Sequence, residues 1–229
     1  MTDDREIPLT GGRITQGVVR KGDLVLRPVC ANGSFVHDVL LWLERKGVSS
    51  APRFLGIDER GREMLSFLPG QSPDNIGFFT DDQCLEAVHI IRRHHEALTD
   101  YPGCPSGQTV CHNDLSPCNF MFRCSMPYAV FDWDSACFGD PLDDLAYAAW
   151  MWLDLGNEEA EPGEVTRRIR LLLAGYGVDR AGRWRFIERI QGQMKRVAEG
   201  IYPTEEQARA TRDWAMECSR WLRENVECI

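Results

Sequence analysis

The sequence predicts an α+β fold in two parts, a small strand-rich part followed by a larger and mainly helical one. Short β-prone runs joined by glycine-containing turns dominate the chain before residue 69, whereas apolar residues at helical spacing dominate the chain beyond it. Pro69-Gly70 is a strong stop signal between the two textures. We therefore predict one unit over residues 1–68 and a second over residues 69–229.

The first part is expected to form a small sheet with one helix. Val18–Arg20 and Leu24–Pro28 are β-prone and flank a glycine turn, which predicts a hairpin. Arg53–Asp58 and Arg62–Leu68 predict a second pair of strands. Between the two pairs, Val36–Arg45 has apolar residues at helical spacing and predicts an amphipathic helix.

The second part is expected to be helical except for one strand-bearing segment. A long apolar stripe over Leu85–Leu98 predicts a helix, and Phe120–Arg123 and Tyr128–Phe131 predict two short strands. His95 lies in that stripe and is interpreted as a core histidine. Further helices are expected around the stripes that begin at Leu142, Val165, Ile187 and Trp214.

Composition excludes several classes of protein. No run of about 18 apolar residues occurs and the first residues lack the layout of a signal peptide, so a cytoplasmic protein without membrane contact is expected. The net charge of −9 argues against a nucleic acid polymer as partner and favours a cationic small molecule. The nine cysteines include no CxxC pair, which favours reduced core thiols over disulfides or a metal site.

One segment has the residue types of phosphoryl-transfer chemistry. His112-x-Asp114-x-x-x-x-Asn119 has the form of a kinase catalytic loop, in which the aspartate receives the proton of the attacking hydroxyl. Asp132 follows an apolar strand that would bring its carboxylate near Asn119. An amide and a carboxylate supply the hard oxygen ligands that Mg²⁺ prefers. The sequence therefore predicts a magnesium-dependent centre at these residues.

The same segment continues into Phe131-Asp132-Trp133-Asp134 and then Gly139-Asp140-Pro141-x-x-Asp144-Leu145-Ala146. These ordered blocks resemble the aminoglycoside phosphotransferase and choline kinase superfamily, which implies a protein-kinase-like two-lobed fold. The resemblance implies that Asp114 is the catalytic base and that Asn119 and Asp132 are the magnesium ligands. It assigns supporting roles to His112, Asp134 and Asp144.

In the first lobe the resemblance implies a nucleotide site. Arg27 stands where the superfamily has a strand lysine, and either His37 or Asp38 stands where a helix glutamate is expected. Arginine keeps the positive charge but not the compact geometry of lysine. The remaining expected nucleotide contacts are a loop with Gly11 and Gly12 and a hinge of Ser66, Phe67 and Leu68.

The function implied by the resemblance is transfer of the γ-phosphate of ATP or GTP, with Mg²⁺, to a hydroxyl of a small molecule. The acceptor would be an aminoglycoside-like antibiotic or a related metabolite, and detoxification or self-protection would be the role. A group of acids at a predicted helix start, from Glu158 to Glu164, would suit a cationic acceptor. Two alternatives are a kinase-like binding or immunity protein without catalysis and a metal-dependent hydrolase. Monomer and homodimer both remain open.

Overall fold

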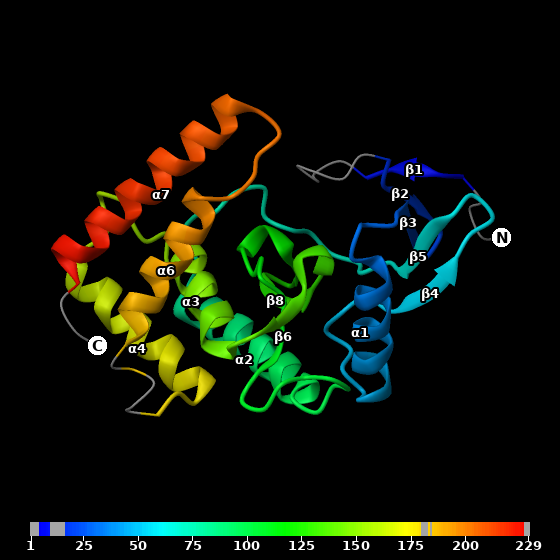
Figure 1. Ribbon diagram of the computed structural model, residues 1–229, viewed down its shortest axis with the longest axis horizontal. Coiled ribbons are helices and arrows are strands. Elements are labelled where there is room, and N and C mark those ends of the chain that lie inside the picture. The colour runs from blue at the N-terminus through cyan, green and yellow to red at the C-terminus, as the bar shows by residue number, and fades with distance from the viewer. Residues whose placement is uncertain (1–4, 10–16, 180–182, 184, 227–229) are drawn as a thin grey trace.

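The computed structural model describes residues 5–9, 17–179, 183 and 185–226. The strands of the first part and helix α1 lie on one side of the molecule, and the helices of the last third lie on the other (Figure 1). Helix α2 and the short strands β6 and β8 lie between them. The predicted division into a small sheet lobe and a larger helical lobe is therefore confirmed as the fold class.

The first lobe contains a five-stranded antiparallel sheet. In spatial order its strands are β1 (Ile7–Pro8), β2 (Val19–Lys21), β3 (Leu24–Pro28), β5 (Arg62–Ser66) and β4 (Phe54–Ile57). Strands β2 to β5 confirm the predicted hairpin and strand pair, although β5 ends at Ser66 rather than Leu68. The two-residue strand β1 was not predicted, because so short a run has no readable alternation.

Helix α1 (Gly33–Arg45) joins the two lobes through a shared core. Its buried residues, Val36, Val39, Leu40 and Leu43 among them, belong to one hydrophobic cluster with residues of the second lobe. Those partners are Leu98, Val110, Trp133 and Ala136. Because this core crosses the predicted boundary at residue 68, the helix of the first lobe is packed against the segment that contains the candidate site.

The described part of the second lobe has five long helices around a second, larger core. They are α2 (Asp81–Leu98), α3 (Pro141–Trp152), α4 (Pro162–Tyr176), α6 (Phe186–Ala198) and α7 (Glu205–Asn225). Thr80 and Gln83 form a capping box at the start of α2, and Asp140 caps α3 ahead of Pro141. Among the described residues, no helix has the length and apolar character needed to cross a bilayer.

Two small two-stranded sheets position the segment between the helices. Strand β6 (Thr109–Cys111) pairs with β9 (Cys137–Gly139), and β7 (Phe120–Arg123) pairs with β8 (Met126–Val130). Strands β7 and β8 were predicted, whereas the pair of β6 and β9 was not. His112 follows β6 directly and Phe131 follows β8, so the two sheets bring the two halves of the candidate site together.

Some of the cysteine and histidine side chains lie in the interior as predicted, whereas Cys124 and Cys137 are exposed. Cys84, Cys111 and Cys218 are buried free thiols, and no disulfide joins any of the described cysteines. His95 is 6% exposed, which confirms its assignment to the core, and His94 is 2% exposed on the neighbouring face of α2. Trp150 and Trp152 are also fully buried.

Candidate functional site

The loop after β6 is held by one buried carboxylate. Asp144, in the first turn of α3, is 1% exposed and accepts hydrogen bonds from the backbone N–H groups of His112 (2.7 Å) and Asn113 (2.8 Å). His95 Nε2 lies 3.0 Å from Asp144 Oδ2. Asn113 has a positive φ of 64°, a sharp turn that these bonds stabilise. Asp144 therefore holds the backbone of the two residues immediately before Asp114.

Charge and burial compete at this carboxylate. Burial alone would raise the pKa of Asp144, but the hydrogen bond from His95 and the bond from the backbone of His112 lower it below its ordinary value. Cys111 lies in the same buried group, where burial and nearby acids raise the pKa of its thiol. Asp144 is already bonded to three donors, so in this group its carboxylate serves to hold the loop.

Asp114 is held by two neutral donors. Its Oδ2 accepts a hydrogen bond from Asn119 Nδ2 (2.9 Å), and its Oδ1 accepts one from the hydroxyl of Tyr147 (2.9 Å). Asn119 Nδ2 also donates to the backbone oxygen of Asp114 (2.9 Å). Burial, followed by the charge of Asp114, raises the pKa of Tyr147, so the tyrosine remains a donor at neutral pH. The carboxylate of Asp114 thus has one set orientation.

Asp132 reaches the same loop through main-chain contacts. The backbone N–H of Phe131 donates to the backbone carbonyl oxygen of Asn119 (3.0 Å). His112 Nε2 lies 3.0 Å from the backbone carbonyl oxygen of Phe131. Asp132 itself has a left-handed backbone, with φ 63°, at the end of β8. A backbone hydrogen bond thus joins Asn119 to the residue directly before Asp132, and a shared metal site of the two side chains stays a prediction.

Arg27 connects the first lobe to this centre. Its Nε contacts Glu63 Oε1 at 2.6 Å and its Nη1 contacts Asp132 Oδ1 at 2.9 Å, while Nη2 also bonds to Asp134 Oδ1. The Arg27 side chain is 10% exposed and that of Glu63 is 2% exposed. Burial would lower the pKa of Arg27, but the bond to Asp132 and the charge of Asp134 raise it, so the cation is permanent.

The partner of Arg27 differs from the expectation. The glutamate that contacts Arg27 comes from β5 rather than α1, because Arg27 and Glu63 are directly opposite each other in the β3–β5 register. Of the two candidate helix residues, His37 is the one at this cluster: its Nε2 lies 2.7 Å from Glu63 Oε2, and its ring stacks on Phe54. No ion pair joins Asp38 to Arg27 within the described part of the chain.

The other predicted nucleotide contacts are located only in part. Gly11 and Gly12 lie outside the described residues. Ser66 ends β5, and Phe67 donates its backbone N–H to the oxygen of Asp23 (2.8 Å), while Leu68 follows in the connection to the second lobe. The role of these three residues as a hinge beside a nucleotide base stays a prediction.

Three residues of the site were not recognised in the sequence. Glu63 could have been found from the strand register, and Tyr147 stands three residues after Asp144, on the same face of α3. Arg196 had no local signal: α6 places its Nη2 3.3 Å from the oxygen of Asn113 and its guanidinium 5.6 Å from the centre of the Tyr147 ring.

The acidic group at the start of α4 has structural partners. The Glu161 side chain accepts hydrogen bonds from the backbone of Gly163 and Glu164, which makes it the cap of the helix. Glu164 forms an ion pair with Arg167 at 2.6 Å. These two carboxylates are engaged at the helix start, and a contact of the acidic group with a cationic acceptor stays a prediction.

Two sequence comparisons agree with this geometry. Residues 102–181 match the family described as the phosphotransferase enzyme family, and this range contains Asp114, Asn119, Asp132 and Asp144. A trifolitoxin immunity protein of Rhizobium leguminosarum bv. trifolii is 32% identical over 208 residues, which cover 81% of this chain and 79% of that protein.

Solved structures share the fold. The wild-type aminoglycoside 2'-phosphotransferase-IIIa, a GDP complex, is 16% identical and covers 98% of this chain and 93% of its own, with a TM-score of 0.58. An amicoumacin kinase with AMP-PNP and Ca²⁺ is 12% identical over 91% and 86%, with a TM-score of 0.67. A choline/ethanolamine kinase family protein of Mesorhizobium loti is 16% identical over 95% and 87%, with a TM-score of 0.60. The predicted kinase-like fold is thereby confirmed.

Proposed function

Because this chain belongs to the aminoglycoside phosphotransferase and choline kinase superfamily, we propose that it transfers the γ-phosphoryl group of ATP or GTP to a hydroxyl of a small molecule. The observation that carries the proposal is the arrangement at the loop after β6, where the carboxylate of Asp114 is fixed by Asn119 and Tyr147 beside the segment of Asp132. Phosphoryl transfer depends mainly on positioning and charge, and this loop supplies both.

Asp114 is the proposed base. Each carboxylate oxygen has two lone pairs, so Asp114 can accept the hydroxyl of a substrate without losing its bonds to Asn119 and Tyr147. It would orient the hydroxyl oxygen toward the γ-phosphorus and take its proton as the new P–O bond forms and the diphosphate leaves. The two donors keep the carboxylate from rotating, so that Asp114 is held in one orientation before the substrate binds.

The residues fit a magnesium ion. Asn119 directs its Nδ2 to Asp114, which leaves its Oδ1 as an oxygen ligand. Asp132 uses Oδ1 for Arg27, and its side chain is 37% exposed, so its second oxygen is accessible. These are the hard oxygen donors that Mg²⁺ selects. When bound, the ion would neutralise charge on the phosphate oxygens, and Asp134 would stand beside it, held by Arg27.

Arg27 is proposed to organise the nucleotide side. It has five N–H donors, of which the contacts to Glu63, Asp132 and Asp134 engage three. The remaining donors can bind a phosphate oxygen, the task that a lysine has elsewhere in the superfamily. Glu63, held by His37, keeps the guanidinium aligned with β3.

A role in protection against a toxic compound is proposed from the relative of Rhizobium leguminosarum, whose name is that of an immunity protein. Adding a phosphate changes the charge and size of a small molecule and can remove its fit to a target. The second candidate is a binding protein without catalysis. It is favoured by one observation: Arg27 forms ion pairs with both Asp132 and Asp134, the carboxylates proposed to bind or stand beside the metal.

The deciding experiment measures Mg²⁺-dependent ADP or GDP release with a panel of aminoglycosides, other hydroxyl-bearing antibiotics and amino alcohols. Asp114→Ala should reduce acceptor-stimulated release by about 10²- to 10⁴-fold and leave the melting temperature almost unchanged. Asp213→Ala, an exposed aspartate on α7, is the matched control and should behave as wild type. Nucleotide binding without release for any acceptor would favour the binding protein.

The metal assignment has its own test. Asp132→Ala should abolish the tightening of ATP binding by Mg²⁺ in isothermal titration, because the ion loses its carboxylate ligand. Asp213→Ala should retain that tightening. Full Mg²⁺ dependence in Asp132→Ala would move the metal to other residues.

A further inference from the structure

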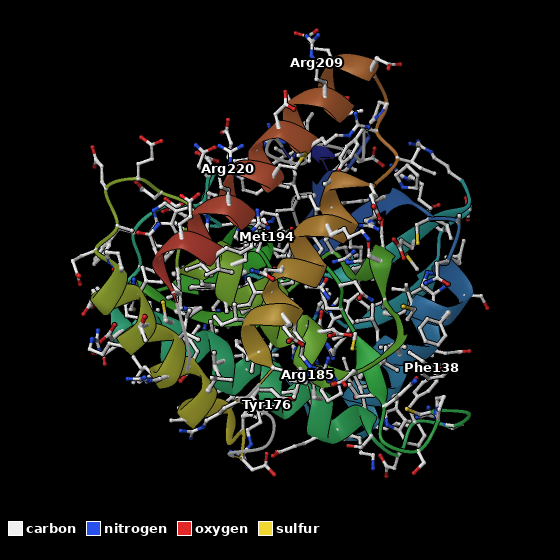
Figure 2. The ribbon with its side chains drawn as sticks, turned by 60° about the vertical axis from the view of Figure 1, so that its left-hand side comes forward. Phe138, Tyr176, Arg185, Met194, Arg209 and Arg220 are labelled. Carbon is white, nitrogen blue, oxygen red and sulfur yellow. The ribbon has the colours of Figure 1, made fainter. Side chains whose placement is uncertain are left out.

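Two arginines on α6 face the start of the candidate site and differ in their partners. Arg189 and Arg196 are seven residues apart, two helical turns, and therefore lie on one face of α6. Arg189 contacts Asp140 and Asp143, each at 2.7 Å, so two carboxylates neutralise it. Figure 2 shows α6 and α7 side by side on the surface of the molecule, with Met194 between them.

Among the described residues, the partners of Arg196 are neutral. Its Nε donates to Gln193 Oε1 (2.7 Å), its Nη2 donates to the oxygen of Asn113 (3.3 Å), and its guanidinium lies over the Tyr147 ring. Within the described ranges, no carboxylate forms an ion pair with it, and the residue is exposed. Its neighbour Lys195 faces Glu199 at 3.8 Å. Arg196 therefore presents an unneutralised positive charge to solvent.

That charge lies next to the proposed base. Tyr147 touches both groups, because its hydroxyl donates to Asp114 Oδ1 while its ring lies against Arg196. Arg196 also bonds to the backbone of Asn113, the residue directly before Asp114. A hydroxyl compound seated on Asp114 would thus have its other substituents within reach of the guanidinium. The nucleotide side, with Arg27 and Asp132, is contributed by β3 and the end of β8 instead.

We propose that Arg196 binds an anionic group of the acceptor, so that the substrate class is a hydroxyl compound bearing a carboxylate; this inference rests on the proposed function. The planar fork of arginine matches a carboxylate with two parallel hydrogen bonds. A polycationic acceptor would place like charge against Arg196. The expectation of a cationic acceptor came from the net charge of −9, and the local charge beside Asp114 has the opposite sign.

The experiment uses three six-carbon polyols that differ mainly in the charge at one end: gluconate, sorbitol and glucamine. Their binding to the full chain with Mg²⁺ and ADP is measured by NMR titration up to about 100 mM, which is ordinary for weak ligands. Gluconate should bind about tenfold more tightly than sorbitol, as expected for a hydrogen bond between charged groups, and glucamine should bind most weakly. Arg196→Ala should abolish the preference, and Arg196→Glu should reverse it.

Lys195→Ala is the matched control, because it removes the same charge from the adjacent exposed residue of α6. It should retain the wild-type order of binding. The proposal is overturned if gluconate shows no preference over sorbitol in wild type, or if the preference survives in Arg196→Ala. Because binding is measured without turnover, a protein that transfers no phosphate would still show the charge order, and a true phosphotransferase for uncharged acceptors would not.

Discussion

The carboxylates of the site are held in two different ways on its two sides. Toward the first lobe, Glu63, Asp132 and Asp134 surround the permanent cation of Arg27. In the loop after β6, Asp114 and Asp144 are held mainly by neutral donors, namely backbone N–H groups, an amide and a tyrosine hydroxyl, with one histidine contact. An ion pair made by a long, flexible side chain can persist when the two lobes move slightly relative to each other. Short hydrogen bonds from a backbone N–H group hold a carboxylate in one orientation.

This difference suits the two proposed tasks. In the proposed function the side of Arg27 would admit a metal and a nucleotide, and Arg27 would neutralise its acids before either binds. The side of Asp114 would keep one carboxylate in a single orientation toward the acceptor hydroxyl. Predictions that remove a cation on one side or a donor on the other therefore test the comparison directly.

The largest effect is expected from Arg27→Met. It would leave buried Glu63 with His37 as its partner and would place Asp132 and Asp134 close together without a counter-charge. The free energy of unfolding, measured in urea, should fall by about 3–5 kcal/mol. Arg196→Met, at an exposed arginine, should change it by less than about 0.5 kcal/mol. Equal losses in the two variants would mean that Arg27 is no more structural than a surface arginine.

The next effect concerns the loop. Asp144→Asn keeps the shape of the side chain but presents an NH₂ group to one of the two backbone N–H donors, of His112 or Asn113. The free energy of unfolding should fall by about 2–3 kcal/mol, the cost of an unsatisfied buried group. Asp143→Asn, whose side chain is 45% exposed, should lose less than about 1 kcal/mol. A loss no larger than that of the control would show that the loop has another support.

The sequence predicted most of the elements because their signals are local. The stripe of α2 and the hairpin of β2 and β3 depend on neighbours a few residues apart, and both are present. The β6–β9 pair was missed because each strand has three residues and its partner lies in another part of the chain. No periodicity can be read from so short a run.

The candidate site divides in the same way. Asp114, Asn119 and Asp132 were recognisable as one group because the motif that contains them is nearly continuous. The partner of Arg27 was placed on the wrong element, because strand register, not sequence distance, puts Glu63 opposite it. Arg196 could not be recognised in the sequence, because the packing of α6 against α3 is what places it next to Tyr147.

A smaller effect is expected from Tyr147→Phe, which removes one donor from Asp114 and keeps the ring beside Arg196. With an established acceptor, kcat should fall about tenfold, since a hydrogen bond to a charged group is lost, while the KM for nucleotide should stay unchanged. Tyr128→Phe, whose hydroxyl donates to Pro69 instead, is the matched control. An unchanged kcat in Tyr147→Phe would show that Asn119 alone orients the base.

The last prediction concerns how protein stability depends on pH through His94, a buried histidine of α2. Burial, followed by the charges of His95 and His112, lowers the pKa of His94 to about 3 from an ordinary value of 6.5. Between these values the unfolded chain binds a proton that the folded protein excludes, so the stability contributed by neutral His94 is complete above pH 6.5 and is lost as the pH falls. His94→Gln should reduce the slope of unfolding free energy against pH by up to about 1.4 kcal/mol per pH unit between pH 6 and 4. His89→Gln, at an exposed position on the same helix, is the control and should leave this slope as in wild type. A wild-type slope in His94→Gln would show that the buried ring of His94 does not cause the loss of stability at low pH.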